Sequence, residues 1–548
     1  MDGRAATRFL LEPGSGGFFA TFPPVTDPAP PTEPMLPRPS MYRRMGIAAA
    51  IVAGGVLLSR ILGLVRQIVF AWLLGAGATG DEYFVAFVIP DLLNYLLAGA
   101  YMAITLIPLL SKRFASGDEE DARNAFWAVT RPLTLAISGL VLLAMPFVEP
   151  ILRAIEPGFT EAQVQEAARL TRIVLPAQVF FILGQLFTAW QFAREKFVIP
   201  TLGPIVYNLG IIAGGLIGGV GRDDPGADGF AWGALAGAFV GIFALQWWGA
   251  HREGLRLPGS PTGRHPAVRR YFALAIPLML GQSLVVLDEQ LGRAFGSLTE
   301  DGGVSWLTFG RQTMLVPVGV IAQAAGVAAY PFLARLAAEG KHRELAAAVG
   351  RAVRFVTVLS LAAAAGLMAM SIPIIRTLYE RGSFAPMDTI ATAGTVVLFA
   401  IGVPMWGIQQ ILARGFYARE EMWAPVVIGT AATVAAVPIY WGLNEAMGVD
   451  GLALASSLSI TLYTIGLGAL WYRRTATAEL WPVVRTLAGN LPLAAAAGGA
   501  AWLATEWVLD TLGRTGFVSN LVALAVGGVV LLAIALGPKP VRRDLARR

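Results

Sequence analysis

The 548-residue sequence contains no cysteine, which excludes disulfide bonds, thiolate metal sites and cysteine nucleophiles. Histidine is scarce as well, with three residues, so we expect no histidine-based metal centre and no Ser-His-Asp catalytic set. A glycine-rich phosphate loop of the GxxxxGK[ST] type is also missing, so this chain does not hydrolyse ATP through such a loop. We therefore expect no catalytic residue, no metal and no cofactor, and do not interpret the chain as an enzyme.

Charged residues are scarce too. They make up 14% of the chain, against about a quarter in soluble domains, while 55% of the residues are hydrophobic and the mean hydropathy is +0.62. Apolar runs of about 20 residues recur along nearly the whole length, which predicts an all-α polytopic membrane protein. The net charge of +6 does not indicate a nucleic-acid partner, because the basic residues lie in short loops between the apolar runs.

The sequence repeats itself internally. Short marks of the first half return in the second half in the same order and at a nearly constant offset. A duplicated membrane bundle is typical of transporters whose site lies where the two halves face each other. Chance similarity between small-residue membrane helices is the alternative. The marks are 108–117 with 331–340, 150–153 with 373–376, and 192–195 with 417–420.

We predict about fourteen membrane-spanning helices, as two six-helix lobes in a parallel pseudo-two-fold repeat plus two C-terminal helices. The expected spans are 46–74, 81–111, 124–148, 163–192, 197–220, 229–250, 268–296, 303–335, 347–373, 388–416, 422–443, 449–472, 481–509 and 517–537.

The expected domains follow from these spans. Residues 1–45 are rich in proline and glycine and lack a long apolar run, so we expect a disordered cytoplasmic tail, with Met41 as an alternative start. The remaining divisions are an N-lobe at 46–250, a cytoplasmic linker at 251–266, a C-lobe at 267–475, two further helices at 476–537 and a basic tail at 538–548.

Loop charge sets the expected orientation. Every second loop is basic, and the loops between them, such as 75–80, 221–228 and 297–302, are short, glycine-rich or acidic. Because basic loops stay in the cytoplasm, we expect both termini there, in a multi-pass protein of the bacterial inner membrane. The basic segments are 112–113, 194–196, 252–270, 335–343, 414–419, 473–474 and 539–548.

Two arginines lie within the first apolar run, Arg60 and Arg66. A charge at mid-membrane costs roughly 2.5–3.5 kcal/mol on insertion scales, so each needs a partner or water. Six helical residues separate them by about 9 Å along the axis, which suits an anionic diphosphate bound by two planar guanidinium groups. The alternative is that they reach an interface or pair with a carboxylate.

Acidic residues suggest further roles. Asp81 opens the second span, where it either orients Arg66 or caps its own helix. Glu289 and Arg293 are four residues apart in the seventh span, which predicts an internal salt bridge. Coupling of a cation or proton by Asp288 and Glu289 is the alternative function for these carboxylates.

Three segments carry a family resemblance. Residues 59–66 (SRILGLVR), 81–87 (DEYFVAF) and 90–93 (PDLL) resemble the MurJ/MviN family of lipid II flippases. That family belongs to the multidrug/oligosaccharidyl-lipid/polysaccharide exporter superfamily. The resemblance covers about 46–475. It implies transport in peptidoglycan biosynthesis, cell wall biogenesis and cell shape.

The resemblance also implies site residues. Arg60, Arg66 and Asp81 match polar residues that the family places in or beside a central cavity. The chain departs from the family at Asn94, where an arginine is usual, and at Arg311 and Gln312, where an Asp-Arg pair is usual.

We therefore expect a flippase that moves lipid II, an undecaprenyl-diphosphate glycan, from the inner to the outer leaflet by alternating access. Arg60, Arg66 and Arg311 would line its cavity. Lipid II, membrane lipids and cell-wall synthesis enzymes are the implied partners, and the membrane potential, sodium or protons are the candidate energy sources. The alternatives are a flippase for another polyprenyl-linked oligosaccharide, a cation-coupled drug exporter, which would favour an acidic or aromatic cavity, and a membrane scaffold.

Overall fold

The computed structural model describes residues 39–96, 99–222, 225–257, 265–273, 287–475 and 480–536. By contacts the chain divides into Met1–Ala50 and Ile51–Arg548, and the description below concerns the second unit. Most of the expected N-terminal tail, the middle of the linker and the C-terminal tail lie outside the described residues. Helix α1 begins at Pro39, so residues 39–45 are helical where a tail was expected.

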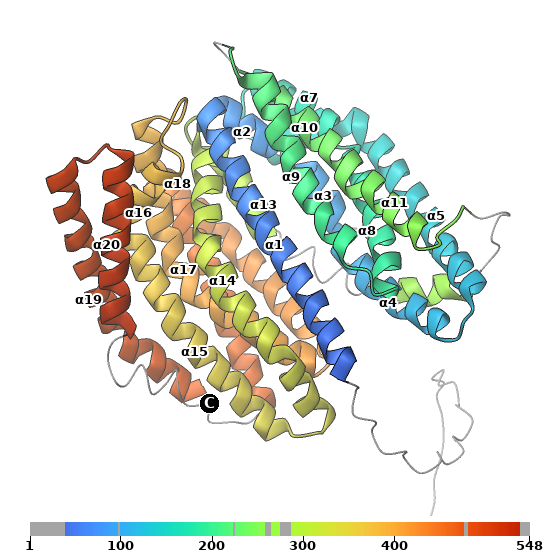
Figure 1. Cartoon of the computed structure of the whole chain (residues 1–548). Helices are drawn as coiled ribbons and strands as arrows, with labels where there is room; N and C mark the ends of the chain where they lie inside the picture. Colours follow the sequence, from blue (N-terminus) through green and yellow to red (C-terminus); the bar gives the residue numbers. More distant parts are fainter. Residues whose placement is uncertain are drawn as a thin grey trace, which may run out of the picture. The chain divides into compact units, whose positions relative to one another are not determined.

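The described residues form helices and no strand, which confirms the all-α prediction (Figure 1). The first half contains α1 (Pro39–Leu74), α2 (Ala78–Val85), α3 (Val88–Leu96), α4 (Gly99–Ala115), α5 (Glu119–Ala144), α6 (Val148–Ile155), α7 (Glu161–Val174), α8 (Ala177–Ala193), α9 (Val198–Gly219), α10 (Asp228–Gly237) and α11 (Leu245–Arg252). The second half contains α13 (Leu287–Gly296), α14 (Gly303–Ala338), α15 (His342–Ala369), α16 (Ser371–Leu378), α17 (Pro386–Ala418) and α18 (Trp423–Thr475), and is followed by α19 (Leu480–Leu512) and α20 (Phe517–Leu536).

The internal repeat is visible in the backbone. Helices α6 and α16 have the same length, and the same offset separates their first residues and their last residues. Glu195 and Glu420 follow the ends of α8 and α17 with φ of 59° and 60°, a left-handed conformation that glutamate rarely adopts. At both positions the backbone closes the helix with the same pair of Schellman hydrogen bonds. The duplication is therefore structural and does not reflect composition alone.

Ten helices among the described residues are long and apolar enough to cross a membrane. One of them, α18, continues through a kink at Gly448 and therefore covers two expected spans. The expected span 81–111 is instead broken into α2, α3 and α4, and the span 303–335 is the 36-residue helix α14. The described residues include only the two ends of the span 268–296. The count of fourteen stays a prediction.

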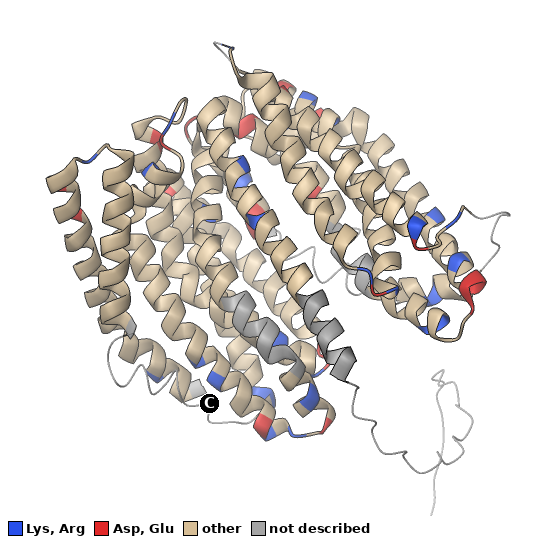
Figure 2. Cartoon of the chain, in the orientation of Figure 1, with Lys and Arg blue, Asp and Glu red and all other residues tan. Residues whose placement is uncertain are grey.

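Charged residues lie mainly at helix ends and in loops, as Figure 2 shows. We call one end of the bundle the basic end, which includes the loops 116–118, 194–197, 339–341 and 419–422. The loops 75–77, 156–160, 297–302 and 379–385 lie at the other end, which we call the opposite end.

An aromatic cluster joins the two halves beneath the opposite end. The Phe309 ring of α14 lies 5.6 Å from the Phe84 ring of α2 and 6.2 Å from the Phe70 ring of α1, measured between centroids. On its other side Phe309 contacts Tyr379 and Phe384 of the second half. Edge-to-face and tilted arrangements of this kind add to the stabilisation from apolar burial. The cluster fixes α14 against α1 and α2.

Helices α19 and α20 pack against each other and against α15 and α16 (Figure 1). Small residues permit the close approach: a Cβ on Gly498 would lie 3.2 Å from that of Ala365 in α15. At the opposite end the Arg376 guanidinium of α16 donates to the Arg514 carbonyl, over 2.9 Å. The two additional helices therefore extend the second half.

Candidate functional site

Arg60 and Arg66 of α1 are the cations that the described structure leaves unpaired within the first span. Arg60 is exposed and Arg66 is half-buried, and neither has an ion pair or hydrogen bond with a described residue. The Arg60 guanidinium lies against α14, since a Cβ on Gly319 would come within 2.4 Å of its Nη1 atom. Arg66 acts electrostatically on Tyr83 of α2 and Tyr207 of α9. Both guanidinium groups are therefore available to an anion.

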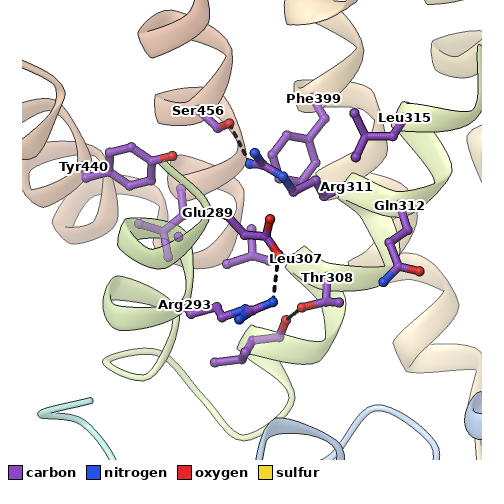
Figure 3. A pocket seen from close by; sticks show the side chains of 13 residues that line it. Glu289, Arg293, Leu307, Thr308, Arg311, Gln312, Leu315, Phe399, Tyr440 and Ser456 are labelled. Carbon is purple, nitrogen blue, oxygen red and sulfur yellow. Dashed lines mark hydrogen bonds and ion pairs between the residues drawn. The ribbon is translucent and has the colours of Figure 1, made fainter. Parts of the chain in front are cut away.

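Arg311 of α14 is, by contrast, neutralised by a carboxylate. Its Nη1 atom lies 3.0 Å from Asp288 Oδ2 of α13. The same atom lies 3.4 Å from Ser456 Oγ of α18 (Figure 3). Asp288 accepts two further hydrogen bonds, from Ser456 Oγ over 3.0 Å and from Tyr440 Oη over 2.9 Å. The Arg311 guanidinium also lies 5.8 Å from the Trp406 ring, a cation–π distance. The group is a satisfied network that ties α13, α14 and α18 together.

Glu289 and Arg293 form the salt bridge that their spacing predicts, over 2.7 Å (Figure 3). The second Arg293 nitrogen lies 3.3 Å from Asp91 Oδ2 of α3, so the ion pair continues into the first half. Arg293 is buried, and its two carboxylate partners offset the cost of removing its charge from water. Arg293 therefore links the halves and is not free to bind a substrate anion.

A cavity of about 70 Å³ separates these two networks. Water needs roughly 10–15 Å³ of such volume, so the cavity has room for a few water molecules but not for a diphosphate-linked sugar. Gln312 of α14 is among its lining residues, which places this predicted site residue beside the Arg311 network. Its other lining residues include Glu289, Arg293, Arg311, Tyr440 and Ser456.

Asn94 of α3 lies within the first half. Its side-chain nitrogen donates to Gln178 Oε1 of α8, over 3.0 Å. This bond holds α3 against α8, so Asn94 contributes a helix contact in the present arrangement. Asn94 is not among the residues that line the cavity beside Arg311 and Gln312.

Asp81 caps a helix other than its own. The prediction offered Arg66 or the N-terminus of its own helix as partners, whereas the carboxylate accepts from the Gly302 and Ser305 backbone N–H groups, over 2.8 Å and 2.7 Å. These groups open α14, whose first N–H groups have no partner within the helix. An acidic side chain at that place also complements the helix dipole. Asp81 reaches these N–H groups because α14 begins directly beside α2 at the opposite end.

Further hydrogen bonds join the halves at the same end, and with Asp81 we call them the closure. Gly302 has φ of 100°, and a Cβ there would lie 2.3 Å from the Ala76 carbonyl oxygen, so the position requires glycine. The structure is therefore closed at the opposite end. The other bonds are Gln163 to Asp301 (2.9 Å), Gly158 N–H to Ser297 Oγ (3.3 Å), Ser383 N–H to the Trp72 carbonyl (3.0 Å) and Ser383 Oγ to the Leu73 carbonyl (2.9 Å).

Sequence reasoning missed the hydroxyl groups that satisfy Asp288. Tyr440 and Ser456 lie on either side of the kink in α18 and carry no distinctive local motif. The available signal was indirect: a carboxylate within an apolar run needs donors. Which helix supplies them depends on packing between α13 and α18, which are far apart in the sequence.

A family model described as "Lipid II flippase MurJ" matches residues 70–523. The chain belongs to the MurJ family. Among its relatives are the probable lipid II flippase MurJ of Rhizobium meliloti (strain 1021), 26% identical over 494 residues that span 89% of this chain and 91% of the relative, and that of Haemophilus influenzae, 29% identical over 510 residues that span 88% and 98%.

Solved structures support the same fold. The structure described as "Lipid II flippase MurJ, inward closed conformation" has a TM-score of 0.71 at 20% identity and covers 91% of this chain and 100% of its own. An inward-facing multidrug resistance transporter of the MATE family and the MOP superfamily has a TM-score of 0.64 at 14% identity, with coverages of 76% and 94%. The chain is therefore a multi-pass membrane protein with the transporter fold that the repeat predicted.

Proposed function

We propose that this chain is a lipid II flippase, with Arg60 and Arg66 as the residues that bind the diphosphate. The proposal rests on membership of the MurJ family and on one feature of the charges. Arg293 and Arg311 are neutralised by carboxylates, whereas Arg60 and Arg66 are unpaired among the described residues. Planar guanidinium groups bind phosphate oxygens with two hydrogen bonds at once. An unpaired pair about 9 Å apart along α1 matches a diphosphate with its first sugar.

The orientation follows from loop charge. With the basic end in the cytoplasm, both chain termini lie there too. The closure then faces the exterior, so lipid II from the inner leaflet reaches the arginines from the cytoplasmic side. Rocking of the two halves breaks the closure and exposes the headgroup to the exterior. Enzymes of cell-wall synthesis, which consume lipid II outside, are the partners that this function implies.

The polyprenyl tail needs an apolar path beside the headgroup site. A cavity of about 540 Å³ lies between α15, α17 and α19, and its lining is mainly apolar. Met368 of α15, Pro404 of α17 and Trp502 of α19 are among the lining residues. Burial of each methylene group contributes about 0.8 kcal/mol. We assign α19 to tail binding on this basis, with α20 packed against it.

We infer that Asp288 does not bind a sodium ion in the arrangement seen here. Each of its oxygens already accepts hydrogen bonds, and the Arg311 guanidinium occupies the place of a bound cation. A sodium ion would have to displace a charge-assisted hydrogen bond, which is among the stronger kinds in proteins. Sodium at another site, protons and the membrane potential stay the candidate energy sources.

A flippase for another polyprenyl-linked glycan is the second candidate. One observation favours it: Asn94 and Gln312 are neutral, and the nearby Arg311 is held by Asp288. Helix α1 then offers two unpaired cations in place of a larger set, which suits a less anionic headgroup. A drug exporter is disfavoured, because unpaired arginines repel cationic drugs.

Direct binding tests the proposal. Purified protein in lipid nanodiscs is titrated with lipid II, with undecaprenyl phosphate and with an unrelated undecaprenyl-diphosphate glycan. We expect the tightest binding to lipid II, and rescue of growth when the chain is expressed in bacteria depleted of their own lipid II flippase. Equal binding of the two diphosphate lipids, without rescue, would favour the second candidate.

A further inference from the structure

Glu156 is a buried carboxyl group at the place where the two halves meet. It follows α6 in the loop that leads to α7 and is 1% exposed. Two residues later, Gly158 packs so closely on the second half that a Cβ there would lie 1.9 Å from the Ser297 carbonyl oxygen. The loop that carries Glu156 is therefore part of the closure.

Neither carboxyl oxygen of Glu156 has a hydrogen-bond partner among the described residues. The hydroxyl group of Ser297 lies nearby, but it donates to the Ala294 carbonyl, over 2.8 Å, and accepts from the Gly158 N–H. A buried carboxylate without a partner is costly, whereas the neutral acid form is tolerated far better.

The charges that face Glu156 come from two helices. Arg293 of α13 favours the ionised form of Glu156, and Asp81 of α2 disfavours it. Arg293 is already shared by Glu289 and Asp91, so its charge is offset locally. Burial is therefore the dominant influence on the ionisation of Glu156.

Neighbouring charged groups of the loop are engaged elsewhere. Arg153 of α6 pairs with Glu149, over 3.1 Å, and with Glu161 of α7, over 2.6 Å. In the facing turn, Asp301 accepts from Gln163. These exposed groups form their own network, in contact with solvent.

We propose that Glu156 is a proton-binding residue of the closure, which takes one proton from external water as the halves close and releases it as they part. Membership of the MurJ family does not by itself imply this role for Glu156. It would make the closing step depend on external pH. The inference rests on the alternating-access cycle proposed above, and not on the identity of the transported lipid.

The direction of the pH dependence follows from linkage. Burial raises the pKa of Glu156 from its ordinary 4.5 to about 8, with Arg293 and Ser297 opposing the shift and Asp81 adding to it. A solvent-exposed Glu156 in the open form titrates near 4.5. Between these two pH values the closed form holds a proton that the open form lacks, so each unit rise in pH favours opening by up to about tenfold. Above about pH 8 both forms are ionised and the dependence ends.

Distances between spin labels test this directly, because the chain has no cysteine of its own. Nitroxide labels are placed at Ala162→Cys on α7 and Met387→Cys on α17, both exposed and both at the opposite end. Double electron–electron resonance on the full chain in nanodiscs, without lipid II, is recorded from pH 5.5 to pH 9. We expect the population at longer distance to grow as the pH rises and to level off near pH 8.

Glu156→Gln keeps the shape of the protonated acid and cannot ionise, so the part of the response that continues up to about pH 8 should be lost. Glu156→Ala also lacks a titrating group and should lose the response as well. The matched control is Glu161→Gln, which removes an exposed carboxylate of the same region and should keep the wild-type response. A wild-type distribution that ignores pH, a response that survives in both Glu156 variants, or a response lost in Glu161→Gln would overturn the proposal. No lipid is added, so the outcome of this measurement does not depend on whether the protein binds lipid II.

Discussion

Asp81 of α2 accepts the Gly302 N–H, over 2.8 Å, and thereby caps a helix of the other half of the chain. The same carboxylate accepts the Ser305 N–H, so both of its oxygens are used. A helix N-terminus is a ready anion site, and here a side chain of the first half fills it. The contact turns an ordinary capping interaction into a bond that must break when the exterior side opens.

Replacement of Asp81 should therefore loosen the closure. Asp81→Ala removes two hydrogen bonds from a charged acceptor, a loss of roughly 2–5 kcal/mol in the closed state. We expect the spin-label pair at positions 162 and 387 to shift toward longer distance at constant pH. Asp118→Ala is the control, since Asp118 caps α5 at the basic end by accepting from Asp121 N–H. An equal shift in both variants would mean that the effect is not specific to the closure.

The Asp288–Arg311 network should behave as one unit in unfolding. Arg311→Ala leaves Asp288 charged and buried with only hydroxyl donors, a loss of about 3–5 kcal/mol. The double variant Asp288→Ala/Arg311→Ala removes both charges and should recover part of that loss. Denaturant unfolding of the purified single and double variants measures the difference. A double variant that is no more stable than Arg311→Ala would show that the ion pair does not account for the effect.

Orientation can be checked with single cysteines in the cysteine-free chain. The loop after α9 should face the exterior and the loop between α4 and α5 the cytoplasm. Arg222 is exposed in the first loop, and Ser116 is exposed in the second. In intact cells an impermeant thiol reagent should label Arg222→Cys and spare Ser116→Cys. The reverse pattern would contradict the assignment of the basic end to the cytoplasm.

The repeat, the helical class and the Glu289–Arg293 pair could all be predicted because they depend on local spacing. The constant offset between the halves places α6 and α16 in register, and an i, i+4 separation brings two side chains to one helix face. Interactions between helices could not be predicted in this way. The partner of Asp81 belongs to the other half of the chain, and no local pattern links the two positions.

Glu156 shows the same limit at a single position. In the sequence it is a glutamate beside Pro157 in a loop, a pattern that is typical of an exposed turn. Its burial arises because the loop packs under Ser297 of the second half. Arg60 and Arg66 were recognisable because they are charges within an apolar run, but their lack of partners could be seen only once neighbouring carboxylates were placed.

The unpaired state of Arg66 leads to the sharpest functional prediction. Arg66→Ala removes no ion pair, so the unfolding free energy of the variant should stay close to that of the wild type. Lipid II binding should fall by about tenfold to a hundredfold, as expected for the loss of a charge-assisted contact of roughly 1.5–3 kcal/mol. Arg66→Lys should recover only part of the binding, because an ammonium group lacks the planar fork.

Arg293→Ala provides the contrasting variant. It leaves Asp91 and Glu289 without their shared cation, so it should lower the unfolding free energy by about 3–5 kcal/mol. Lipid II titration and denaturant unfolding on the same preparations of each variant separate the two effects. If Arg66→Ala binds lipid II as tightly as the wild type does, the diphosphate is held elsewhere, and the pairing pattern of the arginines does not identify the site.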